Sequence, residues 1–289
     1  MDPCPKIADI LRLLEWAQLL SRLVNPPPHI MFQTRHLVFL VCLVVLLVAT
    51  PAAEAANRWA PVGRKPLSDA RAAALVTRMP ETRPENVMAN RYVPTITELQ
   101  SFRSTRNIYG QTPAQWNPLF RYVTGRPGLK NPSTDDLIQW AARKWGIPAP
   151  WMRAVMVVES SWRQTHMGDR ATVPFNWYAQ YPFQAQIPGT FDVFQSMGVM
   201  QVKWSPAGTA SPGTEALRWK STAFNLDYYG AKIRYYYDGL CDWCTGSYGP
   251  HQQWASIGAW YQPTPWRTGS QHYVDHVKSV LAARTWRSY

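Results

Sequence analysis

The sequence predicts a mainly α-helical fold with a small irregular or β-hairpin lobe. Apolar residues recur every three or four positions in the segments 133–145, 222–238 and 271–284, which is typical of amphipathic helices. Residues 163–197 lack this periodicity and hold many aromatic side chains, so we expect the lobe there. These helices leave little of the chain for a large sheet, and a hydrophobic content of 46% supports a buried core.

Residues 31–55 have the features of a secretory signal peptide. A basic start is followed by an apolar run at 37–48, and the small residues Ala53 and Ala55 fit the cleavage rule. The run is shorter than the roughly 20 apolar residues of a membrane span. We therefore expect cleavage after Ala55, a secreted or periplasmic location in the cell envelope, and no stable membrane span afterwards; an uncleaved anchor is the alternative. Because a signal peptide stands at a true N-terminus, residues 1–30 are interpreted as an upstream extension from start-site choice.

The next segment, residues 56–132, is basic and interrupted by prolines. Ser68 precedes a run of helix-forming residues, which predicts one helix, but no pattern here indicates chemistry. We expect a basic linker or a helical extension. The compact domain is expected to cover residues 133–289, and it starts with a helix that Ser133 caps and Gly146 ends.

The chain carries a formal net charge of +12, and this charge favours an anionic partner. Nucleic acid, acidic lipid and an acidic cell-wall polymer all fit that description, and simple solubility is the alternative explanation. No dense run of Lys or Arg occurs anywhere in the sequence, so we expect no nucleic-acid binding.

The segment from Pro150 to Trp162 reads as a nearly apolar helix that carries one carboxylate. Met152, Val155 and Glu159 fall on one face at helical spacing. A carboxylate on an apolar face is costly when ionised, so its pKa is expected to rise. A glutamate that keeps its proton near neutral pH is suited to general acid catalysis. The alternative is that this side chain turns outward or pairs with an arginine.

Four short motifs then follow one another in a fixed order. They are Glu159-Ser160, Gly198-Val199-Met200-Gln201, Asn225-Leu226 and Ala259-Trp260-Tyr261-Gln262. This order resembles the lytic transglycosylase family of the soluble type, whose pattern is a helix-terminal Glu-Ser, a Gly-Leu-Met-Gln strip, an Asn-Ile helix and an Ala-Tyr-Asn turn. The resemblance covers about residues 133–285. It implies an α+β lysozyme-like domain that cleaves the β-1,4 bond between N-acetylmuramic acid and N-acetylglucosamine in the glycan strands of peptidoglycan.

The implied chemistry needs one carboxylate and neither metal nor cofactor. Most glycosidases use two carboxylates, whereas here Glu159 would first donate a proton and then accept one from the muramyl C6 hydroxyl, leaving a 1,6-anhydro product. One alternative is a muramidase, a hydrolase with the same acid that uses water and Asp192 as a second carboxylate. The other is a catalytically silent cell-wall-binding module.

The resemblance also suggests substrate-binding residues. Met200 and Gln201 would line the sugar cleft, with a core position as the alternative for Met200. Tyr261 would bond near the acid or be structural, and Gln262 stands where the family has asparagine. Ser160 would orient the acid or cap its helix. Rings that would stack on sugars, or simply pack, are Trp177, Tyr178, Tyr181 and Trp204.

Two further features of the sequence lead to specific expectations. The family has a serine a few residues before its Gly-Leu-Met-Gln strip, and Phe191, Asp192 and Val193 occupy that neighbourhood here, so the serine is interpreted as missing. Cys241 and Cys244 are the only cysteines after the expected cleavage point. In an oxidising compartment we expect them to form a local disulfide rather than a redox motif or half a zinc site.

Overall fold

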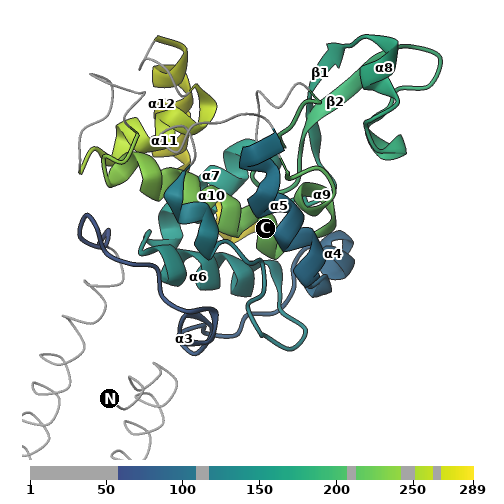
Figure 1. Ribbon diagram of the computed structural model, residues 1–289. Helices are drawn as coiled ribbons and strands as arrows, with labels where there is room; N and C mark the ends of the chain where they lie inside the picture. Colours follow the sequence, from purple (N-terminus) through teal and green to yellow (C-terminus); the bar gives the residue numbers. More distant parts are fainter. Residues whose placement is uncertain (1–57, 109–116, 207–212, 242–250, 263–267) are drawn as a thin grey trace, which may run out of the picture. The chain divides into compact units, whose positions relative to one another are not determined.

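The computed structural model describes residues 58–108, 117–206, 213–241, 251–262 and 268–289 (Figure 1). The expected signal peptide and the upstream extension lie outside the described residues, and so does Cys244.

Helices α6 (Thr134–Trp145) and α7 (Ala149–Ser160) form a hairpin that carries the candidate acid at its end. Ser133 and Asp136 make reciprocal capping bonds at the start of α6, and Gly146 ends it at a φ of 64°. Pro148 precedes α7, and Ser161 ends that helix in the left-handed region at a φ of 51°. The capping signals in the sequence therefore predicted both helices correctly.

Helix α10 (Thr222–Tyr237) is the buried centre of the helical unit. It packs against α6 and against α11 (Gln253–Tyr261), while α12 (Thr268–Ala283) packs against α7 and α11. Short segments complete the unit at α9 (Leu217–Lys220) and η5 (Thr285–Ser288). The mainly α-helical prediction is confirmed for the described part of the chain.

The segment before Ser133 belongs to the same body as the helices after it, since Trp59–Tyr289 form one compact unit. Phe102 and Phe120 are buried in the main core and contact Tyr228 of α10. Of the two expectations for this segment, a helical extension packed on the later helices fits the structure and a separate linker does not, and no boundary between compact units falls at residue 133. Its elements are α3 (Asp69–Ala73), η1 (Pro84–Asn86), α4 (Val87–Arg91), α5 (Ile96–Ile108) and η2 (Pro118–Tyr122).

A buried ionic network fastens this segment to the helices. The Lys144 ammonium lies 2.7 Å from Asp69 of α3 and 2.7 Å from Asp227 of α10. Asp227 also accepts hydrogen bonds from the indole N–H of Trp145 and the backbone N–H of Gly125. Because Lys144 and Asp227 are buried, each charge depends on these partners.

The aromatic segment after α7 forms a small antiparallel sheet, which confirms the expected lobe. Strand β1 (Met167–Thr172) pairs with β2 (Asp192–Met197), and β2 pairs with the short β3 (Val202–Lys203). Helices α8 (Phe175–Tyr178) and η3 (Phe183–Ala185) lie between the first two strands in sequence. Buried and exposed residues do not alternate cleanly along β1 and β2, so these strands gave no period-two signal in the sequence.

The lobe has a hydrophobic core of its own, and it stands apart from the helices in Figure 1. Tyr181 and Trp204 are each 3% exposed, and their ring centroids lie 5.1 Å apart. These two rings therefore pack inside the lobe, where no sugar can stack on them. Trp177 and Tyr178 are partly buried against the same core.

Two further expectations concern a membrane span and a disulfide bond. Among the described residues, no helix combines the length and the apolarity that crossing a membrane requires. Cys241 takes part in a disulfide bond, as expected for an oxidising compartment.

Candidate active site

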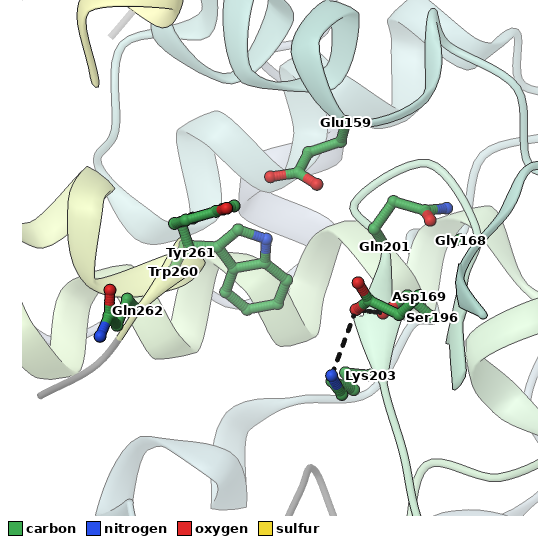
Figure 2. A pocket seen from close by; sticks show the side chains of 9 residues that line it. All are labelled: Glu159, Gly168, Asp169, Ser196, Gln201, Lys203, Trp260, Tyr261 and Gln262. Atoms are coloured by element: carbon green, nitrogen blue, oxygen red, sulfur yellow. Dashed lines mark hydrogen bonds and ion pairs between the residues drawn. The ribbon is translucent and has the colours of Figure 1, made fainter. Parts of the chain in front are cut away.

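A pocket of about 470 Å³ opens between the end of α7, the lobe and the end of α11 (Figure 2). It brings together four of the residues singled out in the sequence, from three separate motifs. The lining consists of Glu159, Gly168, Asp169, Ser196, Gln201, Lys203, Trp260, Tyr261 and Gln262.

Glu159 lies in the last turn of α7, and its carboxyl group points into the pocket (Figure 2). Burial is the largest influence on its pKa, which rises from 4.5 to about 8. The hydrogen bond from Tyr273 opposes this rise, the negative charge of Asp169 adds to it, and the hydrogen bond from Trp260 again opposes it. At neutral pH the carboxyl group is therefore mostly protonated.

The hydroxyl group that bonds Glu159 belongs to Tyr273 of α12, where the sequence had suggested Tyr261. Tyr273 is 6% exposed and donates its phenolic proton to the Oε1 atom of Glu159. Burial and the neighbouring Glu159 raise the pKa of Tyr273 well above 10, so this phenol stays protonated and remains a donor. Tyr261 is 61% exposed and stacks on the Tyr273 ring at a centroid distance of 5.2 Å.

The Gly198–Gln201 turn is held by a buried amide from α10. Asn225 donates to the carbonyl of Met197 at 3.0 Å and accepts from the backbone N–H of Met200 at 2.7 Å. Gly198 has a φ of 85°, and a side chain there would collide with the Asn225 amide. Gly198 of one motif and Asn225 of another are thus in direct contact, and the absence of a side chain at Gly198 makes room for the Asn225 amide.

Ser160 and Met200 support the pocket from behind and do not line it. The Ser160 hydroxyl donates to the Val199 carbonyl at 2.9 Å, which ties the end of α7 to the turn. Met200 is fully buried, and its carbonyl accepts a hydrogen bond from the Trp260 indole at 3.1 Å. Both residues therefore position the acid and the indole, and neither is placed to contact a substrate.

Gln201 does line the pocket, and its side chain is held firmly. The backbone of Gln201 is left-handed, with a φ of 51°. Its amide donates to the His166 carbonyl at 3.0 Å and to the Gly198 carbonyl at 2.8 Å. A Cβ atom on Gly168 would lie 2.5 Å from the Gln201 Oε1 atom, so a larger residue there would displace this amide.

The second carboxylate of the pocket is Asp169 of β1, and sequence reasoning missed it. The backbone of Asp169 has a φ of 53°, unusual within a strand. Its Oδ2 atom accepts a hydrogen bond of 2.5 Å from Ser196 and lies 3.5 Å from the Lys203 ammonium. Ser196, which stands two residues before Gly198, therefore supplies a serine in the pocket, and the interpretation that none is present near the strip was wrong.

Asp192, the carboxylate proposed from the sequence for a hydrolase, lies at the other end of the hairpin from the pocket. It pairs with Arg170 at 2.6 Å and accepts from the Thr172 hydroxyl at 2.5 Å. These two bonds, the Thr172 bond first, keep the pKa of Asp192 below its usual value. Asp192 does not line the pocket, so Asp169 takes its place as the candidate second carboxylate.

Within the described residues, no group of three His, Cys, Asp or Glu side chains is arranged to hold a metal ion. The chain matched no protein-family model, no curated protein and no solved structure. The inference of its function therefore depends on the motifs of its sequence and on the geometry of this pocket.

Proposed function

We propose that this protein is a secreted lytic transglycosylase with a lysozyme-like domain, acting on the glycan strands of peptidoglycan. The observation that carries the proposal is the carboxyl group of Glu159, which lines the pocket and whose pKa burial raises to about 8. A group of this kind donates a proton at neutral pH, which an ordinary glutamate does not. The order of the four sequence motifs supports the same reaction.

In the first half of the reaction, Glu159 transfers its proton to the glycosidic oxygen between N-acetylmuramic acid and N-acetylglucosamine. The bond from that oxygen to the muramyl C1 atom breaks, and N-acetylglucosamine leaves with a hydroxyl group. Positive charge develops at C1 while Glu159 becomes a carboxylate. Tyr273, which donates a hydrogen bond to this carboxylate, stabilises the negative charge as it forms.

In the second half, the muramyl C6 hydroxyl attacks C1 and passes its proton to the Glu159 carboxylate. This step closes the 1,6-anhydro ring, regenerates the acid and consumes no water. Because the nucleophile belongs to the same sugar, its proximity is provided by the substrate. General acid and base catalysis of this kind contributes on the order of 10²–10⁴-fold.

A muramidase is the second candidate, and Asp169 is the observation that favours it. Asp169 lines the same pocket and is close enough to raise the pKa of Glu159. In this reaction a water molecule would attack C1 and give its proton to Asp169, while Glu159 serves as the acid. The hydrogen bond from Ser196 and the ion pair with Lys203 hold Asp169 in place for such a role.

Digestion of purified peptidoglycan in oxygen-18-labelled water tests both candidates, with the products examined by mass spectrometry. A transglycosylase gives anhydro-muramyl ends without label, and a hydrolase gives reducing ends that carry it. Glu159→Gln should abolish either product, whereas Glu85→Gln, a change in η1 away from the pocket, should leave the products unchanged. If the wild type binds peptidoglycan and releases nothing, the protein is a binding module and the proposal fails.

A further inference from the structure

Tyr229 of α10 is a buried phenol whose hydroxyl group has no hydrogen-bond partner among the described residues. Its side chain is completely shielded from solvent. A buried hydroxyl without a partner loses its hydrogen bonds to water and gains nothing in return. A phenylalanine would fill the same space without this cost, so the oxygen atom of Tyr229 calls for an explanation.

Tyr229 lies beside the groups that surround the candidate acid. Its ring packs edge-on against the Trp260 indole, with centroids 4.9 Å apart and an interplanar angle of 76°. The nitrogen end of that indole is directed toward Glu159 (Figure 2). The charge of Glu159 raises the pKa of both Tyr229 and Tyr273, after burial as the main cause, and Tyr229 in turn raises that of Tyr273. Tyr229 therefore packs on an indole that lines the pocket beside Glu159, and its hydroxyl group is a buried donor without a partner among the described residues.

We propose that Tyr229 is a positioning residue for Glu159, and that its hydroxyl group donates a hydrogen bond to the carboxylate once the acid has released its proton. In the neutral acid, one oxygen accepts from Tyr273 and the other carries the proton that the substrate receives. When that proton leaves, the second oxygen becomes a full acceptor, and a donor held nearby without a partner is free to bond it. A hydrogen bond made only when Glu159 is ionised stabilises the transition state that leads to the carboxylate. It does not stabilise the resting enzyme, so it lowers the barrier of the reaction.

The titratable groups that face Glu159 come from three elements. Tyr273 lies on α12, Tyr229 on α10, and Asp169 on β1, where Lys203 pairs with it. Asp169 opposes ionisation of Glu159, and Tyr273 favours it. Removing the Tyr229 hydroxyl group should therefore shift the titration of Glu159 toward higher pH, because a donor to the carboxylate is lost.

The test is an NMR titration of carbon-13-labelled glutamate side chains, with the Glu159 signal assigned by its loss in Glu159→Gln. In Tyr229→Phe we expect the pKa of Glu159 to rise by about one unit, equivalent to a tenfold change in ionisation. Tyr236→Phe, at a buried tyrosine of the same helix outside the pocket, should leave it unchanged. Incorporation of 3-fluorotyrosine at position 229 makes a stronger donor without removing the ring, and it should shift the pKa downward.

On peptidoglycan, Tyr229→Phe should lower kcat by about tenfold with KM unchanged. This kinetic consequence rests on the proposed function, whereas the titration does not. An unchanged Glu159 pKa in both Tyr229 variants would overturn the inference, whatever the activity. A shifted pKa in a protein that cleaves no peptidoglycan would instead leave the inference standing and refute the proposed function.

Discussion

Tyr273 and Glu159 stand 114 residues apart in the chain, and their side chains are joined by a hydrogen bond from phenol to carboxyl group. The bond links the last turn of α7 to the first turns of α12, two helices that pack against each other. The acid therefore depends on the C-terminal part of the chain for its electrostatic environment.

Replacing Tyr273 with phenylalanine should impair the first half of the reaction, in which Glu159 becomes a carboxylate. The carboxylate loses a donor, so the pKa of Glu159 rises above its value of about 8 and the alkaline limb of the pH–rate profile moves to higher pH. We expect kcat to fall roughly 10- to 100-fold, in the range of general acid–base effects. Tyr181→Phe is the matched control, because it removes a similarly buried and bonded phenol from the lobe core. An unshifted profile in Tyr273→Phe would contradict the assigned role.

The raised pKa of Glu159 also predicts how stability depends on pH. Between pH 4.5 and about 8 the unfolded chain ionises this group and the folded chain does not, so the folded state holds more protons. The free energy of unfolding therefore falls as the pH rises through this window. Glu159→Gln should be more stable than the wild type by roughly 1–4 kcal/mol at pH 8 and nearly equal to it at pH 4. Denaturant titrations at both pH values measure the difference, and equal stabilities at pH 8 would count against a buried acid.

Asp169→Asn separates the two candidate reactions by rate. In a transglycosylase this change removes a negative charge beside Glu159, which lowers the pKa of the acid and changes the rate by roughly tenfold or less. In a hydrolase it removes the base that activates water and should cost roughly 10²–10⁴-fold. Asp275→Asn, at an exposed position of α12 paired with Lys278, is the control. Steady-state rates on peptidoglycan distinguish the two outcomes.

The network around Lys144 should matter for stability far more than a surface ion pair does. Lys144→Met leaves Asp227 buried without its cation, and breaking a buried pair in this way costs about 3–5 kcal/mol. Lys278→Met breaks an exposed pair and should cost far less, because solvent screens both charges. Chemical denaturation of both variants measures the contrast, and a similar small loss in each would show that the network is not required.

The parts of the fold that could be predicted from sequence are those with local signals. Ser133, Gly146 and Pro148 determine the ends of α6 and α7 through short-range capping geometry, and no distant residue is needed to recognise them. Glu159 could be recognised for the same reason, since its apolar neighbours lie on one helical face. The packing of residues 59–108 and 117–132 onto α10 left no such signal, because it depends on contacts over long sequence separations.

The residues missed in the pocket had signals that were ambiguous or absent. Tyr273 belongs to the buried stripe of α12, and a tyrosine in such a stripe reads as packing even though its hydroxyl group needs a partner. Asp169 faces the pocket from a strand position with a left-handed backbone, and strand alternation does not predict this. Ser196 became visible as a pocket residue only when the pairing of β1 with β2 was known.

The shared core of the N-terminal segment and α10 sets the smallest fragment that retains the fold. A fragment starting at Ser133 would lose Phe102 and Phe120 and uncover the aromatic face of α10 that they contact. It would also remove Asp69, one of the two carboxylates that accompany Lys144. Such a fragment would keep every residue that lines the pocket, yet its newly exposed rings would favour aggregation over solubility. The intact folding unit therefore begins at Trp59, far upstream of the first sequence motif.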